Sequence, residues 1–337
     1  MSLEKLIVPE GYRPALTVRE TEHAIKKIKD RFELELAAEL NLYRISAPLY
    51  VTPESGLNDN LNGVERPVSF DIRETGRTVE IVHSLAKWKR LALKKYGFRP
   101  GEGIYTDMNA IRRDEDLDNL HSVYVDQWDW EVILTPENRN IETLKNIVRG
   151  IYSALRRTEE YICGIYPRLK PSLPERIHFV TTAQLEERYP ALSPREREDA
   201  ITRELGAVFL MGIGGRLASG TVHDGRAPDY DDWNLNGDIL LYYPLLARAF
   251  EISSMGIRVD AQTLASQLKA AGCEERSELP FHRALLEGRL PQTAGGGIGQ
   301  SRLCMFLLQK AHIGEVQASV WPEEMTRLCH ENHIDLL

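Results

Sequence analysis

The stretch that decides the fold is Pro291–Leu308, PQTAGGGIGQSRLCMFLL. Three consecutive glycines and Gly299 precede Arg302, and apolar residues then recur at helical spacing. The pattern predicts a glycine-rich strand or turn that leads directly into a buried helix. Without a Cβ, glycine lets the backbone lie flat against a ligand, and an arginine at the helix start can grip a phosphate with two parallel hydrogen bonds. We therefore predict a nucleotide platform, against the alternative of an ordinary turn before a core helix.

The glycine runs match neither of the two common phosphate-binding motifs. The chain has no G-x-x-x-x-G-K-[ST], and GGGIGQ has Gln300 where G-x-G-x-x-G requires glycine. In a second run, GIGG at 212–215, Leu217 takes the last position. A nucleotide site in this chain is therefore predicted to be neither a P-loop nor a Rossmann site.

Composition places the chain among ordinary globular proteins. Its 337 residues include 42 basic and 50 acidic residues, a formal charge of −8 that argues against broad electrostatic binding to nucleic acid. The four cysteines are widely spaced, as in a reduced cytosolic protein. No apolar stretch approaches the ~20 residues that span a bilayer, and MSLEKLIVPEGYRP has no signal-peptide pattern. We expect a cytoplasmic protein without membrane contact.

The N-terminal region predicts a helix followed by a strand. A capping box of Thr17 and Glu20 opens a helix that reaches about Leu40. The next segment, LYRISAPLYV at 42–51, is predicted to be a strand. Because Pro48 cannot donate to a sheet ladder, we expect this strand at an edge or an interface.

The rest of the chain predicts strands interspersed with helices. Two alternating apolar runs around Thr75-Gly76 predict a β-hairpin. Ser84 is predicted to cap the basic helix LAKWKRLALKKY, and the acidic RAPDYDDWNLNG precedes a strand expected to begin at Asp238. With no repeat, linker or composition break, we expect one domain over 1–337. The pattern favours an α+β fold, a mostly antiparallel sheet flanked by helices.

One predicted strand, HSVYVDQWDWEVIL, has an unusual polarity. At a period of two, Gln127, Asp129 and Glu131 share one face, and Trp128 and Trp130 share the other. The tryptophans predict a core face. The polar face is either exposed to solvent or lines a polar cleft.

Several motifs together resemble a known family. GGGIGQSRL resembles the third motif of class II aminoacyl-tRNA synthetases, IRRDEDL with the strand to WDWE resembles the second, and the helix and strand with Pro48 resemble the first, a dimer interface. A closer resemblance, to the ammonia-dependent asparagine synthetases (aspartate–ammonia ligases that form AMP), spans about Asp59 to Trp321. It is carried by HSLAKWKR, HSVYVDQWDWE, RAPDYDDW, LNGDI, SSMGIRVD and GGGIGQSR.

The resemblance implies a fold and a reaction. The fold is a class II synthetase-like catalytic domain that acts as a homodimer. The β-carboxylate of L-aspartate attacks the α-phosphate of ATP, pyrophosphate leaves, and ammonia converts the β-aspartyl-adenylate to L-asparagine and AMP. Positioning and electrostatic stabilisation supply most of the rate in such chemistry.

The resemblance also implies roles at the ATP end of the site. Arg112 matches the arginine on the α-phosphate, with Arg113 as its rival, and Arg302 matches the arginine at the γ-phosphate. Gly297 belongs to the glycine platform under ATP. Asp238 and Glu251 match acidic residues near the phosphates, which makes chemical sense if Mg²⁺ lies between them.

The remaining roles concern aspartate and ammonia. Lys89 and Arg258 match a carboxylate-binding pair, which we assign to the α-carboxylate because the β-carboxylate has to face ATP. Gln127 and Asp129 suit the substrate ammonium group. Asp59, in a loop, is a hypothesis for a second contact to that group or to incoming ammonia. Asp231 is a weaker candidate, since a turn residue gives the same pattern.

Two other functions remain open from the sequence. An aspartyl-tRNA synthetase-like paralogue would need an anticodon-binding barrel, and the short segment before Thr17 is expected not to form one, so we expect no tRNA partner. A non-catalytic sensor of amino acids or nucleotides could lose the phosphate-binding residues, which this chain retains. The tail cluster Cys329-His330-x-x-His333 is interpreted as chance rather than as a metal site.

Overall fold

The structure is a computed structural model that describes residues 5–61 and 63–337. Residues 1–4, at the start of the stretch predicted to lack a signal peptide, and Asn62, in the predicted loop around Asp59, lie outside the described residues. Within the described part of the chain, no helix combines the length and the apolar character needed to cross a membrane.

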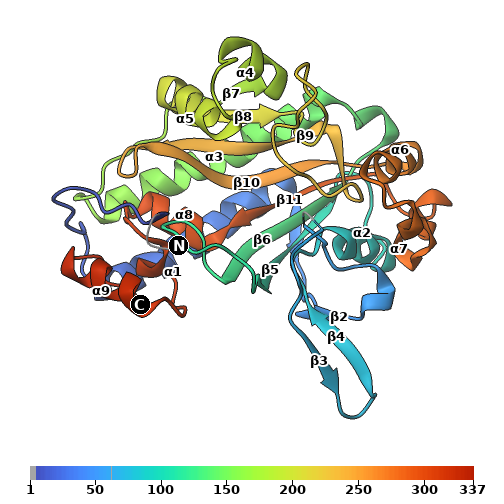
Figure 1. Ribbon diagram of the computed structural model, residues 1–337, viewed down its shortest axis with the longest axis horizontal. Helices are drawn as coiled ribbons and strands as arrows, with labels where there is room; N and C mark the ends of the chain where they lie inside the picture. Colours follow the sequence, from blue (N-terminus) through green and yellow to red (C-terminus); the bar gives the residue numbers. More distant parts are fainter. Residues whose placement is uncertain (1–4, 62) are drawn as a thin grey trace.

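An eight-stranded sheet forms the centre of the molecule (Figure 1), with the strand order β1-β5-β6-β11-β10-β9-β8-β7. The two outermost pairs, β1–β5 and β7–β8, are parallel, and all pairs between them are antiparallel. The predicted α+β fold with a mostly antiparallel sheet is confirmed. The strands are β1 Leu42–Arg44, β5 Gly103–Ile111, β6 Tyr124–Ile133, β7 His178–Thr181, β8 Ala207–Met211, β9 Asp231–Tyr243, β10 Arg248–Arg258 and β11 Thr293–Gly299.

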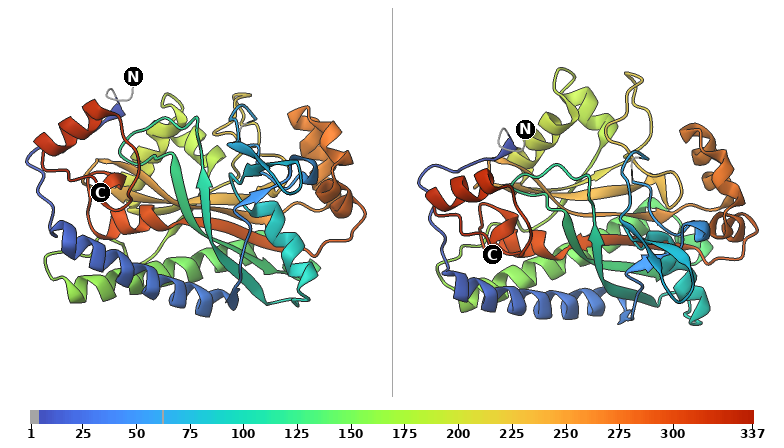
Figure 2. Two further views of the ribbon diagram at one scale, coloured as in Figure 1. Left: turned by 90° about the horizontal axis from the view of Figure 1, so that it is seen from below. Right: turned by 60° about the horizontal axis from the view of Figure 1, so that its bottom comes forward.

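Two long helices, α1 (Val18–Leu40) and α3 (Ile141–Ile165), cover one face of this sheet (Figure 2). The capping box that begins α1 is formed as predicted: the Thr17 and Glu20 side chains each accept a hydrogen bond from the other residue's backbone N–H. The buried stripe of α1 recurs every four residues and includes Phe32, whose ring centroid lies 4.8 Å from that of Trp128. The tryptophan face of β6 is therefore the core face.

Shorter elements complete the fold. A three-stranded sheet projects from the body (Figure 1); its strands are β2 Tyr50–Val51, β4 Arg77–Ile81 and β3 Ser69–Ile72, and β3–β4 is the predicted hairpin. The shorter helices are α2 Ala86–Lys95, α4 Thr182–Arg188, α5 Pro194–Leu205, α6 Ala261–Ala271, α7 Pro280–Leu286, α8 Gln300–Leu307 and α9 Glu323–Glu331.

The prediction of one strand at 42–51 is wrong. The segment splits into Leu42–Arg44, at the edge of the large sheet, and Tyr50–Val51, at the edge of the small one. Pro48 lies between the two strands, where its missing N–H would interrupt a ladder. Both pieces do lie at sheet edges, as the proline requires.

Two further boundaries differ from the predictions. Helix α2 has Leu85 as its N-cap, so Ser84 lies one residue before the cap; the Ser84 hydroxyl donates to Asp59 Oδ2 at 2.8 Å and accepts from Ala86 N at 3.5 Å. Strand β9 begins at Asp231, not at Asp238. A carboxylate is tolerated that early in the strand because Arg258, its partner across the ladder, neutralises it.

The contact between α1 and β6 predicts a large stability effect. Phe32 is fully buried, so Phe32→Ala is expected to lower the free energy of unfolding by about 3–5 kcal/mol through lost burial and the cavity left behind. Val320→Ala, in the segment before α9, removes a side chain that is 85% exposed and should change stability by only about 0.5 kcal/mol. Urea unfolding measures both. Equal losses would contradict the packing described.

Candidate active site

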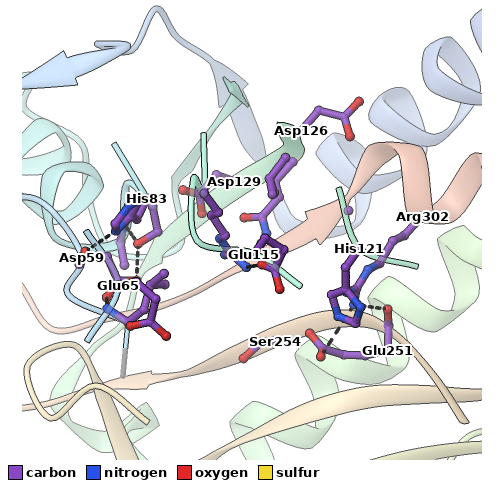
Figure 3. A pocket seen from close by; sticks show the side chains of 18 of the residues that line it. Asp59, Glu65, His83, Glu115, His121, Asp126, Asp129, Glu251, Ser254 and Arg302 are labelled. Carbon is purple, nitrogen blue, oxygen red and sulfur yellow. Dashed lines mark hydrogen bonds and ion pairs between the residues drawn. The ribbon is translucent and has the colours of Figure 1, made fainter. Parts of the chain in front are cut away.

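A cavity of about 440 Å³ lies on the face of the sheet opposite α1 and α3. It is lined by β6, β10 and β11, by the loop after β5, and by the segment before β9. Figure 3 shows Asp59 and His83 at one end, Asp129 in the middle, and Arg302 with Glu251 at the other end. The volume is in the range of small-molecule and cofactor sites.

Strand β6 supplies the polar wall of this cavity. Gln127 and Asp129 line it, while Trp128 and Trp130 are buried on the opposite face. Of the two alternatives for the polar face, the cleft is therefore the one that the structure contains. Glu131, the next residue on that face, is fully buried.

The glycines of β11 create room for these side chains. A Cβ on Gly295 would overlap the Glu131 carboxylate, and one on Gly297 would overlap the Gln127 amide. Both glycines belong to an ordinary extended strand, so close approach is what excludes a side chain there. The glycine-rich strand therefore keeps the cavity floor open and lets buried polar groups lie against it.

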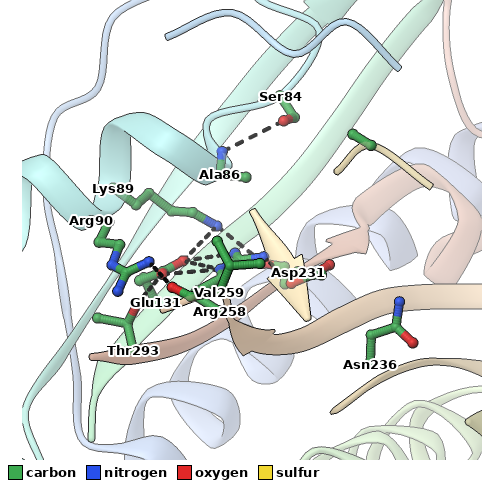
Figure 4. A network of polar contacts seen from close by, with 12 residues as sticks. Ser84, Ala86, Lys89, Arg90, Glu131, Asp231, Asn236, Arg258, Val259 and Thr293 are labelled. Atoms are coloured by element: carbon green, nitrogen blue, oxygen red, sulfur yellow. Dashed lines mark hydrogen bonds and ion pairs between the residues drawn. The ribbon is translucent and has the colours of Figure 1, made fainter. Parts of the chain in front are cut away.

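A buried network of charges surrounds Arg258 in the cavity wall (Figure 4). Arg258 donates to Glu131 at 2.7–3.1 Å and also to Asp231. Burial lowers the pKa of the Arg258 guanidinium, but the two carboxylates outweigh it and raise that pKa. The guanidinium is therefore a fixed cation in the cavity wall.

Lys89 does not line the cavity; it lies behind Asp129, which does. Its ammonium group pairs with Asp129 and donates to the carbonyl oxygens of Trp130 at 2.8 Å and Gly296 at 3.4 Å. Burial raises the pKa of the Asp129 carboxyl, and Lys89 opposes that rise. Lys89 holds Asp129 in place, and direct contact between Lys89 and substrate stays a prediction.

The opposite end of the cavity carries the arginines. Arg302, at the start of α8, donates to the Glu251 carbonyl oxygen at 3.0 Å, and its guanidinium lies 3.7 Å from the Glu251 carboxylate. Arg112 and Arg113 both line the cavity in the loop after β5. Arg112 Nε is buried without a hydrogen-bond partner among the described residues. An unpartnered buried donor of this kind is what an incoming anion would satisfy.

Asp238 lies behind Arg226, a residue of the cavity wall, and pairs with it through Oδ2. Its Oδ1 is buried and has no hydrogen-bond partner among the described residues. Burial raises the pKa of Asp238 to about 7; Arg226 counters this rise and the Glu251 charge adds to it. Burial likewise acts to raise the pKa of Glu251, but Arg302 and Arg226 hold that pKa below its ordinary value.

This pair of carboxylates fits one kind of metal site. Across the described ranges, no group of three or more His, Cys, Asp or Glu side chains forms a candidate metal site. A metal held by protein side chains alone therefore does not fit, whereas Mg²⁺ shared between one or two carboxylates and substrate phosphates does. The unpartnered Asp238 Oδ1 is the atom with a free position for such an ion.

The structure brings most of the predicted site residues together. Lys89 and Asp238 do not line the cavity and lie behind Asp129 and Arg226. Of the tail cluster, Cys329 is buried and the His330 side chain is 84% exposed. The predicted residues that line the one cavity are Asp59, Arg112, Arg113, Gln127, Asp129, Asp231, Glu251, Arg258, Gly297 and Arg302.

Sequence reasoning missed several cavity residues. Arg226 is the first residue of RAPDYDDW, and His83 is the first of HSLAKWKR, so both stand in motifs that carried the family resemblance. Their place in these motifs, together with their basic or titratable side chains, is the sequence signal that could have identified them as site residues. Glu131 was placed on the polar face of its strand, but its role as the partner of Arg258 required the fold.

Asp126, another residue of the cavity wall, holds the helix of Arg302. Its carboxylate accepts hydrogen bonds from Ser301 N at 3.0 Å and Ser301 Oγ at 2.8 Å, and it pairs with Lys29 of α1 at 3.0 Å. The N-cap of α8 is Gly299, which has no side chain to cap the helix. Asp126 therefore supplies from β6 the cap that α8 lacks.

Removing this cap should disturb the position of Arg302. Asp126→Ala removes a charge-assisted contact worth about 1.5–3 kcal/mol, so we expect kcat/KM for ATP to fall about 10–100-fold. Ser301→Ala removes only the hydroxyl donor and should cost less. Steady-state kinetics with varied ATP measure both variants. An Asp126→Ala enzyme with unchanged ATP kinetics would show that the helix start does not position Arg302.

Comparison with known proteins identifies the family of this chain. A protein-family model described as aspartate-ammonia ligase matches residues 19–333. Aspartate–ammonia ligases of Ruminiclostridium cellulolyticum and Clostridium perfringens are 65% and 64% identical over 336 residues, which is 99% of this chain and the whole of each relative.

Solved structures show the same fold at low identity. An asparaginyl-tRNA synthetase from Pyrococcus horikoshii, complexed with asparaginyl-adenylate, matches with a TM-score of 0.66 and 15% identity over 90% of this chain and 70% of that one. The Entamoeba histolytica asparaginyl-tRNA synthetase matches with a TM-score of 0.64 and 14% identity over 89% of this chain and 66% of that one. The predicted class II synthetase-like fold is thereby confirmed, and the family follows from the full-length match: the chain belongs to the aspartate–ammonia ligases.

Proposed function

We propose that this chain makes L-asparagine from L-aspartate, ammonia and ATP through a β-aspartyl-adenylate, with release of pyrophosphate and AMP. The observation that carries the proposal is a single cavity whose two ends have complementary chemistry. One end holds the buried Arg258–Asp231–Glu131 network, and the other holds Arg302 and Arg112 around a glycine-rich floor. A carboxylate and a nucleotide triphosphate bound end to end would meet in the middle.

The aspartate half of the site follows from the charges. We assign the α-carboxylate to Arg258, with Lys89 supporting from behind Asp129. The substrate ammonium group is assigned to Asp129 and Gln127. Asp231, which pairs with Arg258, completes this end. The β-carboxylate is then directed toward the arginines, as attack on phosphorus requires.

The ATP half follows from the opposite end. Arg112 is assigned to the α-phosphate, and its unpartnered Nε favours it over Arg113. Arg302 is assigned to the γ-phosphate, and the backbone around Gly297 to the platform. Glu251 and Asp238 would hold Mg²⁺ together with the phosphates. When bound, that ion neutralises phosphate charge during the displacement.

The Mg²⁺ assignment predicts a pH effect. Protonated Asp238 binds no cation, so with a pKa of about 7 the Mg²⁺ affinity should fall about tenfold from pH 8 to pH 6. Bound Mg²⁺ in turn lowers that pKa. Asp238→Asn should lower the Mg²⁺ affinity at both pH values, and that affinity should no longer change between pH 8 and pH 6. Aspartate-dependent ATP–pyrophosphate exchange with varied Mg²⁺ measures this. Asp116→Asn, whose side chain is 83% exposed, is the control.

We also propose that the chain acts as one catalytic domain, as a homodimer and in the cytoplasm. Support for the dimer comes from Leu34, Tyr43 and Leu49, large apolar side chains that are 67%, 53% and 48% exposed along α1 and the edge near Pro48. Burial of such side chains against a second copy would remove apolar surface from water. Sedimentation in solution tests this.

The test of the proposed function is product analysis. Aspartate, ATP and Mg²⁺ are incubated with ammonium, with glutamine, or with tRNA in separate reactions. We expect asparagine, AMP and pyrophosphate from ammonium, without tRNA. ADP in place of AMP would exclude adenylation. AMP formed only with tRNA would favour a synthetase-like paralogue, and binding of ATP or aspartate without turnover would favour a sensor.

A further inference from the structure

His83 stands in the cavity wall beside Asp59 with an unused lone pair. Its Nδ1 lies 3.0 Å from the backbone carbonyl oxygen of Asp59, and a carbonyl oxygen can only accept. The proton of the neutral ring is therefore on Nδ1, and Nε2 carries a lone pair. Nε2 is buried and has no hydrogen-bond partner among the described residues. A buried acceptor left unsatisfied in a cavity wall indicates a ligand that donates to it.

The location of His83 identifies the donor. His83 and Asp59 lie on the far side of Asp129 from Arg302 and Glu251 (Figure 3). In the proposed function AMP departs at the arginine end. The small nucleophile that displaces it therefore has the opposite end available, where His83 is a wall residue. Ammonia is the substrate of that size and carries N–H donors.

The other acceptors at this end are already engaged. Asp59 accepts from the Ser84 hydroxyl at 2.8 Å and from Leu61 N at 2.9 Å. Asp129 pairs with Lys89 and accepts from Leu85 N at 3.1 Å, and Asp231 and Glu131 pair with Arg258. The oxygens of these carboxylates already hold donors or cations, so an incoming N–H group would have to displace one of them. Glu65, which lies beside Asp59 in Figure 3, accepts from Val64 N at 3.3 Å. Among these wall residues of the described chain, imidazole Nε2 is the basic atom without a donor.

We propose that His83 is the general base for ammonia in the second half-reaction, an inference that rests on the proposed function. The ammonia nitrogen attacks the β-carbonyl carbon of the adenylate and forms the C–N bond. The C–O bond to phosphate breaks, and AMP leaves with its electron pair. One proton passes from the nitrogen to His83 Nε2, so asparagine, AMP and imidazolium are the products of the step. The imidazolium then returns its proton to solvent.

Burial of Nε2 adds selectivity to this role. The atom is shielded from bulk water, so ammonia reaches it only after a local shift of the neighbouring side chains. A base that is freely exposed would also activate water and hydrolyse the adenylate. A shielded base limits that side reaction.

The two half-reactions separate the proposal from a structural role. His83→Asn places an amide N–H where Nδ1–H now donates to Asp59 and removes Nε2. We expect aspartate-dependent ATP–pyrophosphate exchange to stay within about threefold of wild type. Ammonia-dependent asparagine formation should fall about 10²–10⁴-fold, the usual contribution of a general base. Hydroxylamine is a stronger nucleophile whose attack gives a more acidic N–H, so hydroxamate formation should fall far less.

Two further variants complete the test. His83→Gln keeps a polar group near Nε2 without its basicity and should behave as His83→Asn does. His121→Asn changes a cavity histidine near Arg302 (Figure 3). Any loss of asparagine formation in this variant should be no larger than its loss of ATP–pyrophosphate exchange. Exchange and asparagine formation falling together in both His83 variants would overturn the proposal in favour of a structural role, and unchanged asparagine formation would overturn it outright. A wild-type enzyme without exchange would instead refute the proposed function.

Discussion

Arg302→Ala is expected to lower aspartate-dependent ATP–pyrophosphate exchange by about 10²–10³-fold, the usual cost of removing one preorganised donor at developing charge. The guanidinium is fixed by the Glu251 carbonyl at 3.0 Å and by a helix start that Asp126 caps. The guanidinium would therefore meet a phosphate without reorganising. Arg302→Lys keeps the charge but loses the planar fork, so its loss should be smaller but still clear.

The control for this variant is an arginine remote from the cavity. Arg283 pairs with Glu278 and its side chain is 54% exposed, so Arg283→Ala should leave exchange unchanged. Thermal unfolding of both variants checks that the fold survives. Full exchange activity in Arg302→Ala would show that the arginine of the Pro291–Leu308 motif does not bind phosphate.

Arg258→Met should have the second large effect, on both stability and aspartate binding. The substitution leaves two buried carboxylates, Glu131 and Asp231, without their cation, and breaking a buried ion pair in this way costs about 3–5 kcal/mol. It also removes the proposed partner of the α-carboxylate, so KM for aspartate should rise. Urea unfolding and kinetics with varied aspartate measure the two effects.

The stability loss should depend on pH in a defined direction. Burial acts to raise the pKa of Glu131, but Arg258 and Lys89 hold that pKa below its ordinary value of 4.5. In the wild type this carboxylate contributes stability above that value, and the contribution is lost as pH falls through the lower folded pKa. Without Arg258 only Lys89 still lowers this pKa, so most of the contribution is absent. The difference between variant and wild type should therefore be largest at neutral pH and shrink as pH falls below 4.5.

A matched surface variant isolates the effect of burial. Arg289→Met breaks the pair with Glu287, in which both side chains are at least half exposed, and should cost about 0–1 kcal/mol at any of these pH values. If Arg258→Met were equally mild, the buried network would not stabilise the fold as described.

The sequence predicted the parts of the site that local patterns determine. Alternation along β6 separated the tryptophan core face from the Gln127 and Asp129 face, and the glycine run marked the strand beside it. A period of two and the absence of a Cβ are properties of the chain itself. The capping box at Thr17 is equally local, and it is formed.

Features that depend on distant partners escaped prediction. Ser84 was predicted to be the N-cap of α2, but the N-cap is Leu85, and the Ser84 hydroxyl donates to Asp59. Asp231 had the pattern of a turn, but Arg258 draws it into a strand. The sequence around Lys89 did not indicate that its ammonium group pairs with Asp129 and donates to two backbone carbonyl oxygens. Each of these contacts joins segments far apart in the chain, and no local pattern encodes such pairing.

In the proposed reaction the β-carboxylate of aspartate becomes bonded to the α-phosphate of ATP. The most direct measurement of this step uses aspartate labelled with ¹⁸O in the β-carboxylate, followed by mass spectrometry of the AMP formed with ammonium. We expect one labelled oxygen in the AMP phosphate, because AMP leaves with the carboxylate oxygen that attacked phosphorus. Unlabelled AMP, with both labelled oxygens elsewhere, would contradict the adenylate and the roles assigned to Arg112, Arg302 and His83.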